Sequence, residues 1–168
     1  MIVIIMGVAG SGKSTVAKVL AKHLCWQYKD ADSYHSPENV AKMSSGIALT
    51  DEDRMPWLES MRKDIEQWIA TEQNMILACS ALKRSYRDIL MVDETAQHFV
   101  YLKGPPQLFA ARLARRKSHF MKQNMLNSQF EALEEPDSSE ATICDARHSI
   151  KEIVLQIEQE IGISPNTK

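Results

Sequence analysis

The sequence predicts a single α/β domain, residues 1–168, in which a mostly parallel sheet of about five strands lies between two layers of helices. Three observations predict this fold. Short apolar runs alternate with segments of helical period along most of the chain. The first apolar run stops at a glycine-rich turn, as a central parallel strand does. The length of 168 residues suits one compact domain, and the chain has no repeat, low-complexity tract or linker.

The first predicted strand and helix flank the glycine-rich turn. Ile2–Met6 is a continuous run of apolar, mostly β-branched residues, which is typical of a strand buried on both faces. From Lys13 onward, apolar residues recur at the spacing of one helix face. A short second strand is predicted at Trp26–Asp30.

Two helices and a third strand are predicted next. Ser36 and Pro37 supply an N-cap followed by proline at the first helical position, and this short helix runs through Met43. Helix-start residues at Thr50–Asp53 begin a longer helix with apolar residues at steps of three and four. Met75–Cys79 is the next strand-like run.

The remaining elements continue the alternation. A basic helix from about Lys83 to Met91 is followed by a strand at Phe99–Leu102. A helix containing Leu108 and Leu113, a strand at Thr142–Cys144 and an amphipathic helix from Ile150 to Ile161 complete the pattern. Ligands of such sheets bind outside the carboxyl ends of the strands, so we expect the functional residues to gather there.

The composition argues against several classes of protein. The net charge of -2 is unlike the strongly basic balance of proteins that coat nucleic acid. The apolar run Met1–Met6 is too short for a signal peptide or a membrane span. Cys25, Cys79 and Cys144 are too widely spaced to indicate a zinc site or a disulfide framework. We therefore expect a cytoplasmic protein with reduced thiols and with neither nucleic-acid nor membrane partners.

A nucleotide-binding motif follows the first strand. Residues 7–14 read GVAGSGKS and match GxxxxGK[ST] in full, between a strand and a helix as that motif requires. Glycines let backbone N–H groups approach phosphate oxygens, and the helix beginning near Lys13 directs its positive dipole end at them. Lys13 is expected to neutralise phosphate charge and the Ser14 hydroxyl to bind Mg²⁺. The motif thus predicts a site for ATP and Mg²⁺ formed by Gly7, Val8, Ala9, Gly10, Ser11, Gly12, Lys13 and Ser14.

Further stretches give the chain a family resemblance. They read DADSYH at 30–35, NVAKM at 39–43, LTDEDRMPWL at 49–58, CSALKRSYRD at 79–88, FVYLKG at 99–104, HFM at 119–121 and SQFEALEEP at 128–136. Together with GVAGSGKST, these stretches resemble the gluconokinases, P-loop kinases related to shikimate and adenylate kinases. CSALK and DRMPWL are far more specific than the phosphate motif. The chain departs from the family pattern at Ala31, where glycine is usual, and at Ser36, where proline is usual.

The resemblance implies an activity and several further residues. It implies transfer of the ATP γ-phosphate to the 6-hydroxyl of D-gluconate, which gives 6-phospho-D-gluconate and ADP. It adds Thr15 to the nucleotide site and implies a mobile lid at approximately residues 112–126. In that lid, Arg112 would stack on adenine and Arg116 would reach the transferring phosphate. The resemblance also implies a homodimer, which no surface pattern in the sequence allows us to derive.

The acceptor side needs a carboxylate for the hydroxyl and cations for the acid group. Asp32 is our candidate for the carboxylate that orients the acceptor hydroxyl and accepts its proton late in the transfer. Asp30 could serve the magnesium water shell instead, and the sequence does not separate these two roles. Guanidinium and ammonium groups are expected around the gluconate carboxylate. The predicted substrate-binding residues are Asp32, His35, Lys42, Arg54, Ser80, Lys83 and Arg87.

Other interpretations stay open. Arg54 could pair with its acidic neighbours, and Lys83 and Arg87 could form a solvated helix face. A kinase for shikimate or a nucleoside monophosphate is an alternative, although shikimate kinases typically carry a glycine cluster where this chain reads CSA at 79–81. A regulatory module that binds ATP without catalysis is another. The joint presence of Lys13, Asp32 and Arg116 as predicted catalytic residues disfavours that module.

Overall fold

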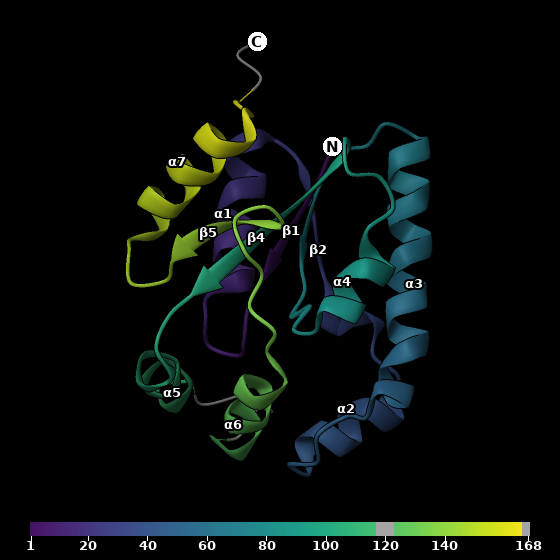
Figure 1. The fold of residues 1–168 in the computed structure, drawn as a ribbon, viewed down its shortest axis with the longest axis vertical. Helices are drawn as coiled ribbons and strands as arrows, with labels where there is room; N and C mark the ends of the chain where they lie inside the picture. Colours follow the sequence, from purple (N-terminus) through teal and green to yellow (C-terminus); the bar gives the residue numbers. More distant parts are fainter. Residues whose placement is uncertain (117–122, 166–168) are drawn as a thin grey trace.

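Five strands form one parallel sheet in the computed structural model, which describes residues 1–116 and 123–165 (Figure 1). The strands are β1 (Ile2–Met6), β2 (Gln27–Asp30), β3 (Met75–Ala78), β4 (Gln97–Lys103) and β5 (Ala141–Asp145). Their order across the sheet is β2-β3-β1-β4-β5, and every neighbouring pair is parallel. All carboxyl ends therefore lie at one edge, where a ligand site is expected.

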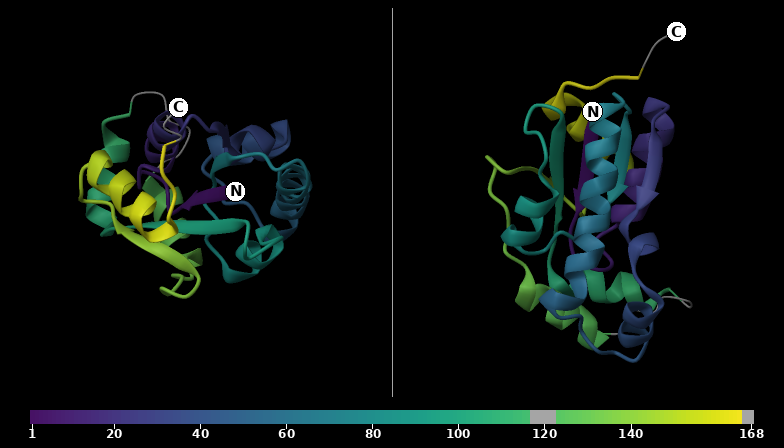
Figure 2. Two further views of the ribbon diagram at one scale, coloured as in Figure 1. Left: turned by 90° about the horizontal axis from the view of Figure 1, so that it is seen from above. Right: turned by 90° about the vertical axis from the view of Figure 1, so that its right-hand side faces the viewer.

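Seven α-helices and one short 3₁₀ helix are found in the described part of the chain. The helices are α1 (Lys13–Leu24), α2 (Pro37–Ser44), α3 (Asp51–Ala70), α4 (Arg84–Leu90), α5 (Pro106–Ala114), α6 (Gln123–Ala132) and α7 (Ile150–Ile161), and the 3₁₀ helix spans Ala31–Tyr34. Figure 2 shows α1 and α7 on one side of the sheet and α3 on the other. The layers are therefore helix, sheet and helix, as predicted.

The central strand β1 separates two hydrophobic cores. Val3 and Ile5 point into the core shared with α1, α5 and α7, whereas Ile2, Ile4 and Met6 point into the core shared with α3 and α4. All five side chains are fully buried, because both faces of the sheet are covered. This rigid strand ends directly at the phosphate motif and holds that motif in place.

The carboxyl edge of the sheet carries the shorter elements. Helices α2, α5 and α6 gather at this end of the molecule, beyond the tips of the strand arrows (Figure 1). Met43 of α2, Leu49 and Met125 of α6 form a small separate cluster there. This edge therefore has its own small core, apart from the two that cover the sheet.

The predicted strands and helices are confirmed, with ends shifted by a few residues. The sheet is wholly parallel, and α6 and the 3₁₀ helix were not predicted. The predicted lid at 112–126 lies partly outside the described residues, which resume at Gln123. In the ranges that the structure describes, no helix is long and apolar enough to cross a bilayer.

Candidate active site

The phosphate loop joins β1 to α1 in a conformation that only glycine adopts easily. Gly10 and Gly12 have φ values of 78° and 99°. A Cβ atom on Gly10 would lie 2.8 Å from the carbonyl oxygen of Phe109, so no side chain fits there. The Ser11 hydroxyl is buried and has no hydrogen-bond partner among residues 1–116 and 123–165. A tight loop with an unused polar group fits a ligand rich in acceptor atoms, such as a polyphosphate.

Lys13 lies at the start of α1, with its ammonium group over the loop. Its Nζ donates to the Val8 carbonyl oxygen at 3.0 Å. Burial lowers the pKa of Lys13, and the nearby carboxylate of Asp32 partly offsets this effect. The protein holds this cation at an energetic disadvantage, which an added anion would relieve.

Asp30, at the end of β2, is hydrogen-bonded to a residue of the phosphate motif. Its carboxylate accepts hydrogen bonds from the Ser14 hydroxyl at 2.7 Å, the Tyr28 hydroxyl at 2.8 Å and the Asp32 amide at 3.0 Å. Burial acts to raise the pKa of Asp30, but these hydrogen bonds outweigh it, so the pKa lies below its ordinary value. Asp30 and Ser14 together present oxygen ligands of the kind that Mg²⁺ prefers.

Asp32 differs from Asp30 in its hydrogen-bond partners and in the direction in which its pKa is shifted. No hydrogen bond to its carboxylate comes from the part of the chain that the structure describes. Burial and the negative charge of Asp30 raise the pKa of Asp32, and Lys13 partly opposes this shift. The carboxylate is therefore available to a ligand and more basic than an ordinary aspartate.

A cavity runs from the phosphate loop across the carboxyl ends of β2 and β3 to α3. It brings together a large group of the sequence-predicted site residues, namely Ala9, Gly10, Gly12, Lys13, Ser14, Asp32, His35, Arg54, Ser80 and Arg116. Nucleotide-binding and acceptor-binding candidates thus share one continuous space. That arrangement suits a transfer between two bound molecules.

His35 stacks on Trp57 in the wall of this cavity. The two ring centroids are 4.6 Å apart and the rings are nearly parallel, at 5°. The Trp57 Nε1–H donates to the Ala31 carbonyl oxygen at 2.7 Å, which ties α3 to the segment after β2. Burial, followed by the charge of Arg54, lowers the pKa of His35 to about 4. The imidazole is therefore neutral at physiological pH.

We expect the His35 imidazole not to titrate above about pH 5, whereas an unperturbed histidine titrates near 6.5. Because a cation at this position would be desolvated beside Arg54, the neutral form persists as the pH falls through the usual range. Nitrogen-detected NMR of the imidazole from pH 4 to 8 measures this directly. A midpoint above about pH 6 for His35 would contradict the prediction.

Arg54 enters the cavity wall from the first turns of α3. The start of this helix is fixed by a capping box, in which the Asp53 amide donates to the Thr50 hydroxyl at 3.1 Å and the Thr50 amide donates to Asp53 at 2.9 Å. Asp53 is also paired with Lys42 of α2. Asp53 is thus engaged by the cap and by Lys42 and does not hold the Arg54 guanidinium.

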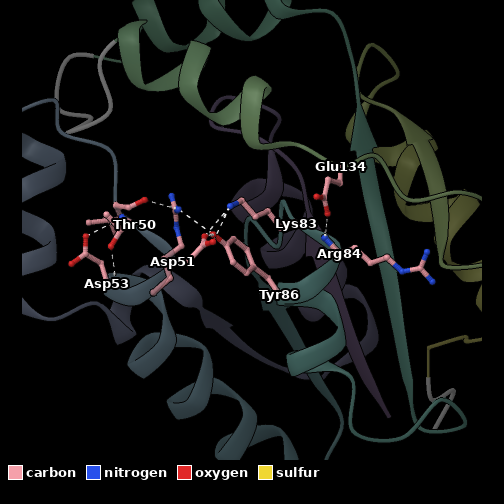
Figure 3. A network of polar contacts seen from close by, with 9 residues as sticks. Thr50, Asp51, Asp53, Lys83, Arg84, Tyr86 and Glu134 are labelled. Atoms are coloured by element: carbon pink, nitrogen blue, oxygen red, sulfur yellow. Dashed lines mark hydrogen bonds and ion pairs between the residues drawn. The ribbon is translucent and has the colours of Figure 1, made fainter.

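Lys42 and Lys83 are held by carboxylates outside this cavity. Lys42 Nζ lies 2.7 Å from an Asp53 oxygen. Lys83 Nζ lies 2.9 Å from an Asp51 oxygen, a pair visible in Figure 3. Neither lysine lines the cavity that contains Asp32. Lys83 lines a neighbouring cavity that shares Arg54 as part of its wall.

Arg87 lies outside the cavity that contains the phosphate loop and Asp32. Its side chain is 4% exposed, and Nη1 donates to the carbonyl oxygens of Ala81 at 3.2 Å, Leu82 at 3.2 Å and Glu134 at 3.0 Å. Ala81, in the loop that supplies two of these carbonyls, has a φ of 43°. The structure therefore does not bring Arg87 to the predicted acceptor site. It uses the guanidinium to hold the loop after β3.

Replacing Arg87 with glutamine is expected to lower the free energy of unfolding by about 2–3 kcal/mol, because two buried carbonyl groups and a partly buried one lose a charged donor. Denaturant unfolding monitored by circular dichroism measures the change. The matched control is Arg84→Gln on the same helix, whose side chain is 69% exposed and whose loss should change stability little. A large rise in the acceptor KM with unchanged stability would contradict this role.

Arg112 and Arg116, which were predicted to belong to a lid, both lie near the phosphate loop. Arg112 Nη1 donates to the Ser11 carbonyl oxygen at 3.3 Å, and its Nη2 donates to the Ala146 carbonyl oxygen at 2.7 Å. Arg116 is exposed and lines the cavity near Lys13. Thr15 is exposed on the first turn of α1. These positions suit contact with a nucleotide, while the individual roles stay predictions.

Gln129 is a cavity residue that sequence reasoning missed. Its Oε1 accepts a hydrogen bond from the Ala9 amide of the phosphate loop at 2.7 Å and so joins α6 to the loop. It lies within the stretch SQFEALEEP, which contributed to the family resemblance without a role being assigned. The resemblance carried by that stretch was the one feature of the sequence that could have pointed to Gln129.

Comparison with known proteins agrees with this geometry. A family model described as shikimate kinase matches residues 9–162. The chain is 42% identical over 167 residues to the thermoresistant gluconokinase of Escherichia coli strain K12, covering 99% of this chain and 90% of that protein. It is 42% identical over 177 residues to a probable gluconokinase of Xenopus tropicalis, covering 96% and 93%.

A solved structure supports the same conclusion. The gluconokinase of Sinorhizobium meliloti 1021 superposes with a TM-score of 0.84 at 36% identity, covering 95% of this chain and 90% of that one. Both the sequence identity and the covered length exceed what a shared fold alone would give. The chain belongs to the gluconokinase family, within the shikimate kinase-like P-loop kinases.

Proposed function

We propose that this protein is an ATP-dependent gluconokinase that transfers the γ-phosphate of ATP to the 6-hydroxyl of D-gluconate. One observation carries the proposal beyond family membership. A single cavity joins the phosphate loop to a carboxylate with a raised pKa, Asp32, and to a cation, Arg54. An acceptor that has a hydroxyl at one end and an acid at the other matches this pair of groups.

The nucleotide is proposed to bind with its polyphosphate in the loop of residues 7–14. Backbone amides and Lys13 neutralise the β- and γ-phosphates, and Arg116 adds positive charge where the transferring group moves. Arg112 holds the adenine side. Ser14 and Asp30 would hold Mg²⁺, whose charge would offset that of the phosphates.

The acceptor is proposed to lie between Asp32 and Arg54. Asp32 orients the 6-hydroxyl, while the guanidinium of Arg54 pairs with the carboxylate. His35 and Ser80 also line this cavity and could offer hydrogen bonds to the other hydroxyls of the acceptor. This arrangement separates the two aspartates, because Asp30 is already bonded to Ser14 and Tyr28.

Transfer proceeds in line. The 6-oxygen forms a bond to the γ-phosphorus as the bond from that phosphorus to the ADP oxygen breaks, and the hydroxyl proton passes to Asp32. The products are 6-phospho-D-gluconate and ADP. The residues act by alignment and charge neutralisation, without a covalent intermediate on the protein.

A substrate panel tests the proposal. ADP release should depend on gluconate and be much slower with idonate, shikimate or nucleoside monophosphates at equal concentration. Shikimate-dependent turnover would favour the related kinase, and ATP binding without turnover on any acceptor would favour a regulatory module. The lid at about residues 112–126, the homodimer and the cytoplasmic location belong to the same proposal and stay to be tested.

A further inference from the structure

One side of the Arg54 guanidinium is anchored to the protein. Nη1 donates to the Leu49 carbonyl oxygen at 2.8 Å and to the Tyr86 hydroxyl oxygen at 3.3 Å. The guanidinium carbon lies 5.7 Å from the centroid of the Tyr86 ring, which adds a cation–π contact. Tyr86 comes from α4, so two helices contribute to the orientation of one arginine.

The Tyr86 hydroxyl is itself oriented by Asp51. It donates its single proton to the Asp51 carboxylate, which also accepts from Lys83 Nζ at 2.9 Å and 3.1 Å (Figure 3). With its proton committed to Asp51, the hydroxyl can only accept from Arg54. Hydrogen bonds in this network are therefore donated in one direction, from the guanidinium to the tyrosine and from the tyrosine to the carboxylate. Tyr86 is 4% exposed, so the arrangement is packed in place.

The Nε and Nη2 atoms of Arg54 lie on the other side of the guanidinium from the anchored Nη1. In the described part of the chain, no acceptor bonds to Nε or Nη2, while the residue lines the cavity that holds Asp32. The Nε and Nη2 hydrogens form the edge of a guanidinium that matches the two oxygens of a carboxylate. Anchoring Nη1 leaves that edge for a ligand.

We propose that Tyr86, oriented by Asp51, is a positioning residue that turns the Nε and Nη2 edge of Arg54 toward the acceptor carboxylate. This gives the enzyme its preference for a sugar acid over the matching neutral polyol. The inference rests on the proposed function and deepens it, because it names the origin of the acid selectivity. A lysine in place of Arg54 could supply the charge but not the paired geometry.

The first test is Tyr86→Phe, which removes the hydroxyl and keeps the ring. The gluconate KM should rise about tenfold, because a charge-assisted pairing loses its fixed geometry. kcat and the ATP KM should stay within about twofold, since neither the phosphate loop nor Asp32 is touched. The preference for gluconate over glucitol, its neutral counterpart, should fall by a similar factor.

Tyr101→Phe is the matched control. Its hydroxyl also donates to a carboxylate, Glu135, at 3.0 Å, but the hydrogen bond from Arg54 goes to Tyr86 and not to Tyr101. Thermal unfolding should shift similarly in the two variants. A gluconate KM that is the same in both would overturn the inference.

A double-mutant cycle separates positioning from a general packing effect. In an Arg54→Lys background, Tyr86→Phe should raise the gluconate KM no further, because the paired edge is already gone. Fully additive effects would show that Tyr86 acts independently of Arg54 and would also overturn the inference.

The activity of the wild-type enzyme distinguishes a failure of this inference from a failure of the proposed function. If it phosphorylates gluconate while Tyr86→Phe behaves like the control, only the positioning role is lost. If it phosphorylates no sugar acid, the proposed function and this inference both fall. Isothermal titration with gluconate gives the same comparison for binding alone.

Discussion

Replacing Lys13 with methionine is expected to lower kcat about a thousandfold, which is the scale of losing a charged group that stabilises the transition state. The methionine keeps most of the side-chain volume at the start of α1 but removes the charge over the phosphate loop. A coupled assay of ADP release measures the change. Lys18→Met, at an exposed position on the same helix, is the control and should leave turnover within about twofold.

The same substitution should not weaken the fold. Because burial lowers the pKa of Lys13, the native state binds this proton less tightly than the unfolded chain does. The charged form therefore opposes folding at neutral pH, and removing it should leave the melting temperature equal or higher. Stability and activity then move in different directions. A kcat within tenfold of wild type would remove Lys13 from the phosphate site.

The sequence predicts best those structural features that form between residues close together in the chain. Ile2–Met6 and the loop after it were predicted with correct bounds, because a β-branched run, a glycine turn and a helix start all lie within one stretch. The capped start of α3 was equally visible, since Thr50 and Asp53 form their capping box across three residues.

Features that depend on distant contacts were not predictable in the same way. Arg54 and Arg87 looked equivalent as cations for the acceptor, but only Arg54 lines the cavity. The difference arises because carbonyls of the loop after β3, where Ala81 has a φ of 43°, accept hydrogen bonds from Arg87. Helix α6 was missed because its place depends on contacts such as that between Gln129 and the Ala9 amide, 120 positions earlier.

The two aspartates after β2 illustrate the same limit. Asp30 and Asp32 are two residues apart and identical in type, so the sequence left their roles open. Both line the cavity, but Ser14 and Tyr28 donate to Asp30, whereas no residue in the described ranges donates to the Asp32 carboxylate. Their pKa values shift in opposite directions as a result.

Replacing Asp32 with asparagine is accordingly expected to lower kcat by about a hundredfold to a thousandfold, which lies within the usual contribution of a group that accepts a proton in the transition state. The ATP dissociation constant should change less than about threefold, because the loop and Lys13 remain. Steady-state kinetics and nucleotide titration measure the two quantities. A kcat within about threefold of wild type would remove Asp32 from its role.

Asp30→Asn is the matched comparison. Because Asp30 bonds to Ser14, its loss should raise the Mg²⁺ concentration needed for half-maximal activity, whereas Asp32→Asn should leave that requirement unchanged. If both variants shifted the metal requirement equally, the proposed division of roles between the two carboxylates would fail.

The pH dependence follows from the raised pKa of Asp32. Since only the ionised carboxylate can accept the proton, wild-type kcat should fall as the pH drops through that raised pKa, and Asp32→Asn should lack this acidic limb. The native state also binds the Asp32 proton more tightly than the unfolded chain, so the ionised form opposes folding at neutral pH. The asparagine variant should therefore melt no lower than wild type. If Asp32→Asn lowers kcat without lowering the melting temperature, a role in catalysis best explains why the chain keeps this carboxylate.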